Sequence, residues 1–137
     1  MSQSEKLRTG EQYSRAEISQ MLGGSSWTYL PRKGGDVVSG CFRLDLNPKA
    51  PEEILVGHGK LRVASAKRLV EQGTPIPVFL NRASKQWEFI GYFRGTRYSD
   101  VASEIAAKAR SANVDGQVAG VLYLAEVKRS TSAPQSA

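Results

Sequence analysis

The sequence predicts an α+β domain: a curved, mostly antiparallel sheet or small open β-barrel of about five strands, with helices on its outside. Two observations predict this class. Several segments carry the alternating apolar pattern of strands, whereas others carry the amphipathic pattern of helices. Their order along the chain is helix, strand, strand, helix, two-stranded hairpin, helix and strand. This order fits a mixed sheet with helices packed against it.

The chain is expected to form one domain. Its 137 residues suit a single core, and the 40% apolar and 23% charged residues are ordinary for a globular protein. We expect residues 1–12 to form a flexible N-terminal segment, residues 13–129 a single globular domain and residues 130–137 a disordered tail. There is no signal-peptide pattern and no apolar run of membrane-spanning length, so a cytoplasmic protein is expected.

The first helix is expected to begin after Ser14 and to end at Gly23. Ser14 and Glu17 have the spacing of a capping box, and glycine tolerates the backbone geometry that follows a last helical turn. The loop at residues 25–35 carries two aromatic residues and two cations, and its proline disfavours regular structure. We interpret Trp27 as a core side chain where the helix meets the sheet. The alternative is a side chain that stacks on a base.

The middle of the chain is predicted to hold two strands and a helix. Residues 36–45 and 53–56 read as strands, separated by a turn with two prolines. A helix of about a dozen residues opens at residues 57–60 and ends at Gly73. Two glycines at its start let backbone amides approach an anion, so this turn is a candidate phosphate contact. The alternative is a plain strand-to-helix turn.

Residues 76–98 are predicted to form a β-hairpin around which the domain is organised. Apolar residues alternate along its first strand, a basic polar turn follows, and aromatic residues alternate along the return strand. We place Trp87, Phe89 and Phe93 on one face of that strand and expect at least two of them in the core. The prolines at the entry to the hairpin predict the edge of a sheet there.

A helix over residues 99–110 and a strand over residues 118–127, covered on both faces, are predicted to complete the domain. The end of that strand carries the strongest enzymatic alternative. Asp115, Glu126 and Lys128 have the residue types with which metal-dependent nucleases hold magnesium and activate water. Asp115 is better explained by an Asp-Gly turn.

The positive charge is concentrated in the middle of the chain. The net charge is +6, and residues 58–98 carry eight basic and two acidic residues, whereas the rest of the chain has eleven of each. A localised basic surface favours a polyanionic partner. The alternative is that these are ordinary solubilising charges.

The cysteine and histidine content argues against metal and nucleophilic chemistry. Cys41 and His58 are the only residues of their types, so the chain cannot supply a tetrahedral zinc site or an internal disulfide. A Cys–His nucleophilic pair would need the two side chains together in space. Cys41 lies in the middle of a predicted strand, where a buried, inert thiol is the usual case. We therefore expect no cofactor and no catalytic residue.

The hairpin resembles the paired central strands of SRA-type and other PUA-like domains. Its strands read Ile-Pro-Val-Phe-Leu over residues 76–80 and Trp-Glu-Phe-Ile-Gly-Tyr-Phe-Arg over residues 87–94. In SRA domains an apolar strand precedes an aromatic-rich strand that contains Tyr-Asp-Gly; here residues 89–92 take that place and Ile90 replaces the aspartate. The resemblance implies a PUA-like fold and a reader of modified nucleotides in DNA or RNA. It does not imply which base is read.

A reader of this kind uses phosphate contacts for position and a pocket for identity. The candidate backbone contacts are Lys60, Arg62, Arg82, Lys85, Arg94 and Arg97. An extruded base would stack on an aromatic ring, and the candidates are Tyr29, Trp87, Tyr92 and Tyr98. The edge of the base would be read by Asn47, Asn81 or His58.

Together these observations predict a non-enzymatic nucleic-acid-binding module. DNA is favoured over RNA as its partner, and a protein partner such as a nuclease subunit is a further candidate. The alternative is a protein–protein adaptor that uses the loop with Trp27 and Tyr29 together with the edge of the hairpin. Phosphate binding weakens steeply with salt, whereas an apolar interface does not, so salt dependence separates the two.

Overall fold

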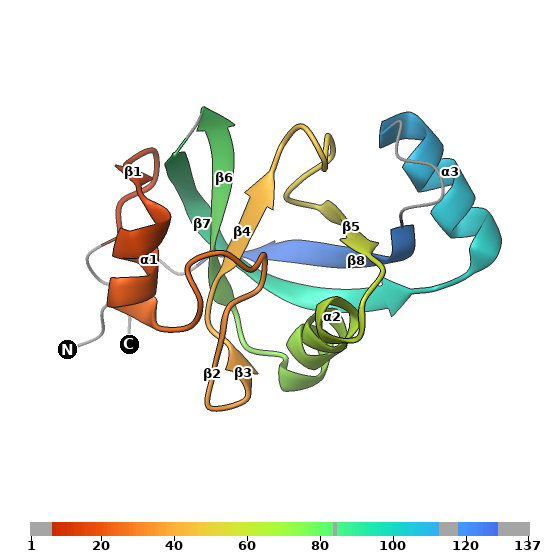
Figure 1. Ribbon diagram of the computed structural model, residues 1–137, viewed down its shortest axis with the longest axis horizontal. Helices are drawn as coiled ribbons and strands as arrows, with labels where there is room; N and C mark the ends of the chain where they lie inside the picture. Colours follow the sequence, from red (N-terminus) through yellow and green to blue (C-terminus); the bar gives the residue numbers. More distant parts are fainter. Residues whose placement is uncertain (1–6, 84, 113–117, 129–137) are drawn as a thin grey trace.

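The computed structural model describes residues 7–83, 85–112 and 118–128, with three helices and eight strands in these ranges (Figure 1). In chain order they are β1 (Gln12–Tyr13), α1 (Arg15–Leu22), β2 (Arg32–Lys33), β3 (Asp36–Val37), β4 (Gly40–Arg43), β5 (Glu53–Gly57), α2 (Lys60–Gln72), β6 (Ile76–Ala83), β7 (Gln86–Ser99), α3 (Ala102–Ala112) and β8 (Val118–Val127). No described helix has the length and apolar character needed to span a bilayer.

The main sheet confirms the predicted fold class. Its strand order is β4-β6-β7-β8-β5, and only the β4–β6 pair along this path is parallel. The long strand β7 pairs with β6 and β1 near its start and with β8 near its end, so the sheet curls around it (Figure 1). The helices lie outside this curled sheet, with α1 and α3 at its two ends and α2 beside its middle.

A β-bulge divides the core into two clusters. The register of β6 against β7 shifts between Val78 and Phe79, opposite Gly91, whose φ of +134° is a backbone geometry that favours glycine. Trp87 and Phe89 therefore pack in a smaller cluster with the helix α1. Phe93, beyond the bulge, packs in the larger cluster under α2. All three aromatics are buried, where at least two were expected to be. The prediction that they share one face is wrong, because the bulge reverses the alternation.

Two boundary expectations also change. Residues 7–12, expected to be flexible, contact the sheet: the Gly10 amide donates to the Phe89 carbonyl, and Gln12 pairs with Glu88 in the ladder. Strand β6 is interior, since it pairs with both β4 and β7. Only the start of β6 is the edge that the prolines predicted, because the pairing of β6 with β4 begins at Val78, one residue after Pro77.

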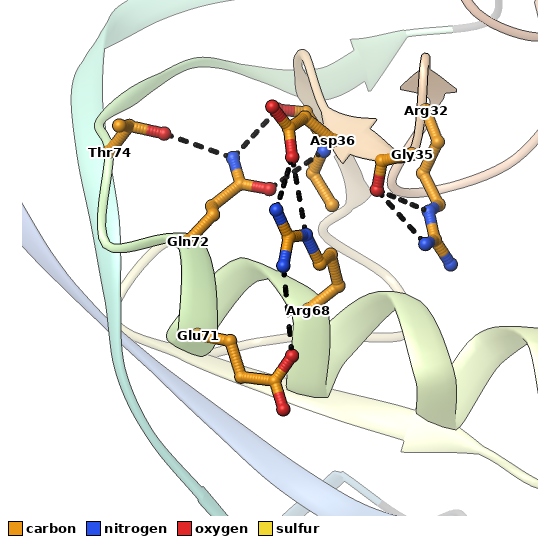
Figure 2. A network of polar contacts seen from close by, with 8 residues as sticks. Arg32, Gly35, Asp36, Arg68, Glu71, Gln72 and Thr74 are labelled. Carbon is orange, nitrogen blue, oxygen red and sulfur yellow. Dashed lines mark hydrogen bonds and ion pairs between the residues drawn. The ribbon is translucent and has the colours of Figure 1, made fainter.

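Strands β2 and β3 form a short ribbon: β2 lies in the segment expected to be an irregular loop, and β3 begins the segment expected to be a strand. Polar contacts hold this ribbon against α2 (Figure 2). The Gln72 side chain pairs with the backbone of Val37 in both directions, each bond 2.9 Å long. Arg68 Nη2 lies 2.5 Å from Asp36 Oδ1, and its other terminal nitrogen lies 3.8 Å from Glu71. These contacts fix the ribbon, which lies between the loop at residues 25–30 and β4, relative to α2.

Candidate nucleic-acid interface

The described structure contains a cleft of about 1040 Å³. One wall is the loop at residues 25–30. The second is β4 with the turn after it, up to Asn47. The third is the junction of β5 and α2, residues 57–62. We call this space the cleft, and its size suits a nucleotide-sized ligand.

The 25–30 loop is held by α1 in a shape that exposes Trp27. Arg15 Nη2 donates to the carbonyls of Ser25, at 3.3 Å, and Thr28, at 2.7 Å, while Ser25 Oγ accepts from the amides of Trp27 and Thr28. These bonds fold the loop into a tight turn, and Trp27 is left 80% exposed at the cleft. The expectation that Trp27 is a core side chain is therefore wrong.

Tyr29 joins the loop to the first turn of α2. Its hydroxyl donates to the carbonyl oxygen of Arg62 over 2.5 Å, and its ring packs against Phe42 with centroids 6.4 Å apart. Burial of the phenol raises the pKa of Tyr29 well above its ordinary value, so the hydroxyl keeps its proton as donor. Two walls of the cleft are thus linked by one side chain.

The floor of the cleft is aromatic and sulfur-bearing. Trp87, Phe42 and Cys41 line it from β7 and β4. The Arg15 guanidinium carbon lies 5.3 Å from the centre of the Trp87 ring, a cation–π contact. Burial raises the pKa of the Cys41 thiol to about 11, so the thiol stays protonated and behaves as an inert core group.

The charge of the cleft has one sign. Among the described residues that line it, five are Arg or Lys, one is His and none is Asp or Glu: the cations are Arg15, Arg32, Arg43, Lys60 and Arg62. The guanidinium of Arg43 lies 2.6 Å from the carboxylate of Asp45, which neutralises its charge. The other four cations form no ion pair with any carboxylate in the described ranges. Such a group of unneutralised cations attracts an anion.

Exposed apolar side chains gather at the same place. Four large hydrophobic residues are exposed in the described structure, and three of them line the cleft: Trp27, Leu46 at 45% and Leu61 at 81% exposure. Flat apolar surface beside cations suits a base with its attached phosphate, because bases stack on aromatic rings whatever their sequence. The cleft therefore offers both contacts that a nucleic acid needs.

Six of the residues nominated from the sequence line the cleft: Tyr29, Asn47, His58, Lys60, Arg62 and Trp87. The Asn47 side chain stabilises the backbone at this place. Its Nδ2 donates to the carbonyl of Arg43, and its Oδ1 accepts from the amide of Leu55 over 2.8 Å, so it braces the turn between β4 and β5. The Arg62 side chain donates to the carbonyl of His58, which tightens the turn before α2.

Of the remaining nominated residues, those with described side chains lie outside the cleft: Asn81, Lys85, Tyr92, Arg94, Arg97 and Tyr98. Asn81 donates to the carbonyl of Gln86 across the hairpin end, next to Lys85 with its φ of +65°. Tyr92 packs against Phe89 with ring centres 5.4 Å apart. The side chain of Arg82 falls outside the described residues.

Arg97 belongs to a second cluster where α3 meets β7 and β8, whereas Tyr98 packs against the larger core cluster beside α2. The Tyr98 ring lies over Gly120, where a β-carbon would approach the ring to 2.3 Å. Arg97 pairs with Glu104 at 2.9 Å and lies 4.2 Å from the centre of the Tyr123 ring. Neither Arg97 nor Tyr98 lines the cleft.

Glu104 is the anion of this second cluster. It accepts hydrogen bonds from the hydroxyls of Ser99, at 2.6 Å, and Tyr123, and it pairs with Arg97. These partners, Ser99 foremost, lower the pKa of Glu104 to about 2. Desolvation and the bond to Glu104 raise the pKa of Tyr123 to about 12. In this cluster, the carboxylate of Glu104 neutralises the charge of Arg97.

Sequence reasoning missed three cations of the cleft as site residues. Arg15, Arg32 and Arg43 lie outside residues 58–98, in the part of the chain where basic and acidic residues are equal in number. The basic surplus at residues 58–98 therefore did not point to them. The loop composition did mark Arg32, since it follows two aromatic residues. Leu61 carried no signal, because its exposure depends on which face of α2 meets the sheet.

The residues of the nuclease alternative are only partly described. Glu126 and Lys128 lie at the end of β8 and are exposed, and Asp115 lies outside the described residues. Within the described ranges, no group of three or more His, Cys, Asp or Glu side chains is arranged to hold a metal ion.

Comparison with known proteins rests on structure. No protein-family model matches the chain, and no curated protein matches its sequence. The SUVH5 SRA domain in a hemi-methylated CG DNA complex has a TM-score of 0.58 and 10% identity, over 95% of each chain. The same domain bound to fully hydroxymethylated CG DNA has a TM-score of 0.59 and 14% identity, over 95% of each chain.

A third similar structure belongs to a larger protein. The type IV phosphorothioation-dependent restriction endonuclease ScoMcrA has a TM-score of 0.52 and 17% identity, over 89% of this chain and 27% of that one. At these identities the likeness concerns the fold. The curled sheet with three outer helices is thus the fold of SRA domains, as the hairpin had indicated.

Proposed function

We propose that the protein binds nucleic acid, DNA in preference to RNA, through the cleft and reads a modified base there without catalysing a reaction. The observation that carries the proposal is the composition of the cleft: its described lining residues include five cations and no carboxylate, beside exposed and floor-lying aromatic rings. The similar folds support it, because the SUVH5 structures are complexes with methylated or hydroxymethylated DNA.

Each part of the cleft has a role in this proposal. Lys60, Arg62 and Arg32 contact phosphates and set the position of the strand. Trp27 stacks on a base that has left the duplex, since an exposed indole has nothing else to cover it. The base then lies toward Trp87 and Arg15 at the floor.

The cleft is preorganised for this role. The Tyr29 bond to α2, the Arg15 bonds to the loop and the polar contacts between β3 and α2 hold all three walls in the unliganded protein. Binding then loses less free energy to ordering of loops.

The basic residues of the hairpin supply a secondary contact. We place Arg82, Lys85 and Arg94 on the phosphates of DNA that continues past the cleft. The contribution of Lys85 and Arg94 is long-range and screened by salt, because these two residues lie outside the cleft.

Fluorescence anisotropy tests the proposal most simply. Short duplex and single-stranded oligonucleotides, with and without modified bases, are titrated at two salt concentrations. We expect binding that weakens steeply with salt through counterion release and tightens when a modified base is present. Absence of binding at low salt would overturn the proposal.

The second candidate is a protein–protein adaptor. One observation favours it: Trp27, Leu46 and Leu61 form an exposed apolar rim around the cleft, and such rims also bind proteins. This candidate predicts a protein partner whose affinity for the chain changes little with salt concentration. If the oligonucleotides fail to bind, this candidate takes precedence.

A further inference from the structure

The position of the Trp27 indole depends on the backbone of its loop. The side chain is 80% exposed, so packing against neighbouring side chains does little to hold it. A contact residue of a binding site has a defined position only when the groups around it fix it. The backbone of residues 25–30 therefore decides whether the indole stays at the cleft.

Arg15 fixes that backbone from the start of α1. Ser14 caps the helix, so Arg15 is its first residue and has a defined place. From there Arg15 Nη2 donates to the carbonyls of Ser25, at 3.3 Å, and Thr28, at 2.7 Å. These two carbonyls lie on either side of Trp27 in the chain. One guanidinium nitrogen thus holds the loop before and after the indole.

The guanidinium of Arg15 is in turn held by the floor of the cleft. Its carbon lies 5.3 Å from the centre of the Trp87 ring, and its Nε is buried with no hydrogen-bond partner among the described residues. Arginine can stack its flat face on a ring while its planar fork donates hydrogen bonds, whereas the compact ammonium of lysine cannot do both. Arginine and lysine are therefore not interchangeable at this position.

We propose, on the basis of the function proposed above, that Arg15 is a positioning residue for the bound base: it holds Trp27 at the cleft and sets the affinity for DNA through that indole. Its charge also attracts the DNA, as any cation at this place would. The positioning effect is the part that depends on the guanidinium and on the presence of Trp27. It requires no direct contact between Arg15 and the DNA.

Arg15→Lys tests this proposal, because it keeps the charge and removes the fork. The probe is a DNA duplex that carries one mispaired 5-methylcytosine, which leaves the base stack easily, and the affinity is measured by fluorescence anisotropy. We expect Arg15→Lys to bind about fivefold more weakly than the wild type, a part of the loss expected when an aromatic ring no longer stacks on a base. An unchanged affinity would overturn the inference.

A double-mutant cycle with Trp27→Ala shows whether Arg15 acts through the indole. In the Trp27→Ala protein, Arg15→Lys should change the affinity by less than about 1.5-fold, because two residues that act through one contact are not additive. The same loss with and without Trp27 would overturn the inference, since a general structural role of Arg15 does not require the indole.

Arg97→Lys is the matched control. Arg97 also lies over an aromatic ring, that of Tyr123, but it is outside the cleft. The same substitution there should leave the affinity unchanged, both with Trp27 and with alanine in its place. A loss that depends on Trp27 and is as large as that of Arg15→Lys would contradict the special role of Arg15.

Urea denaturation establishes that each variant is folded under the conditions of the titrations. If Arg15→Lys is unfolded, Arg15→Met takes its place in the cycle, because its unbranched chain can cover the Trp87 ring and leaves no buried Nε. This variant also loses the charge, which should weaken binding in both backgrounds. The loss should be at least about threefold larger with Trp27 than without it, and equal losses would overturn the inference.

The same titrations separate this inference from the proposed function. Salt-sensitive DNA binding with additive effects of Arg15 and Trp27 leaves DNA binding in place and removes only the positioning role. The same holds if Trp27→Ala binds as tightly as the wild type. Failure of the wild type to bind the duplex at low salt contradicts both.

Discussion

Two regions of the molecule place arginines beside aromatic rings, and they differ in what neutralises the charge. In the cleft, Arg15 lies over Trp87 with no carboxylate partner in the described structure, and Trp27 nearby is exposed. At the far end of the sheet, Arg97 lies over Tyr123 and pairs with Glu104. We therefore expect an arginine–aromatic pair to attract an anionic ligand only where no carboxylate neutralises the cation. The second cluster instead fastens α3 to β7 and β8.

The largest expected effect is on stability, where a buried aromatic residue should differ from the exposed Trp27 of the cleft. Phe89→Ala should lower the free energy of unfolding by about 3–5 kcal/mol, because Phe89 is buried between Phe79 and Tyr92. Trp27→Ala should change it by less than about 0.5 kcal/mol, since the indole is exposed. Urea denaturation measures both. A large loss for Trp27→Ala would mean that the loop is part of the core.

The next effect concerns DNA affinity. Trp27→Ala should weaken DNA binding by about 1–3 kcal/mol, the value of one base stacked on an aromatic ring. Val101→Ala is the matched control, because Val101 is also a large exposed apolar residue but lies outside the cleft. Anisotropy titrations of the two variants at one salt concentration give the comparison. Equal affinities would remove the loop from the interface.

A smaller effect is expected in the salt dependence. Lys60→Gln should reduce the slope of log affinity against log salt by about one, as for the loss of one phosphate contact. Arg97→Gln should leave the slope unchanged, since Glu104 already neutralises that cation. Titrations at four or more salt concentrations measure the slopes. A reduced slope for Arg97→Gln would move the phosphate path to the second cluster.

The smallest expected effect is a pH dependence of stability. Glu104 has a folded-state pKa of about 2, below its ordinary value of 4.5, so its contribution is present above pH 4.5 and is lost as the pH falls toward 2. Glu104→Gln should therefore be less stable than the wild type at neutral pH. The difference should shrink in that acidic window, as followed by thermal unfolding. A difference independent of pH would contradict the ionised role of Glu104.

The fold was more predictable from the sequence than the site. Alternation and capping residues placed the hairpin, α1 and α2 close to their observed bounds, because these signals are local. The bulge at Gly91 was not predictable, since a glycine in a strand is compatible with either register. Phe93 was therefore assigned to the wrong face.

The site depended on contacts between distant segments. Whether Trp27 is buried depends on how Arg15, twelve residues earlier, holds the loop, and no periodicity encodes that contact. Arg43 and Leu61 come together only through the packing of β4 and α2 around the cleft. Local chemistry nominated six of the lining residues, and the tertiary structure added the rest.

Intrinsic fluorescence tests the central claim most directly, because the chain has two tryptophans and both line the cleft. The protein is titrated with the oligonucleotide that binds best by anisotropy, at low and at high salt. If the cleft is the binding site, tryptophan emission changes saturably with the same midpoint as the anisotropy, and Trp27→Phe removes most of the change. Binding by anisotropy with unaltered tryptophan emission would place the nucleic acid elsewhere on the molecule and contradict the assignment.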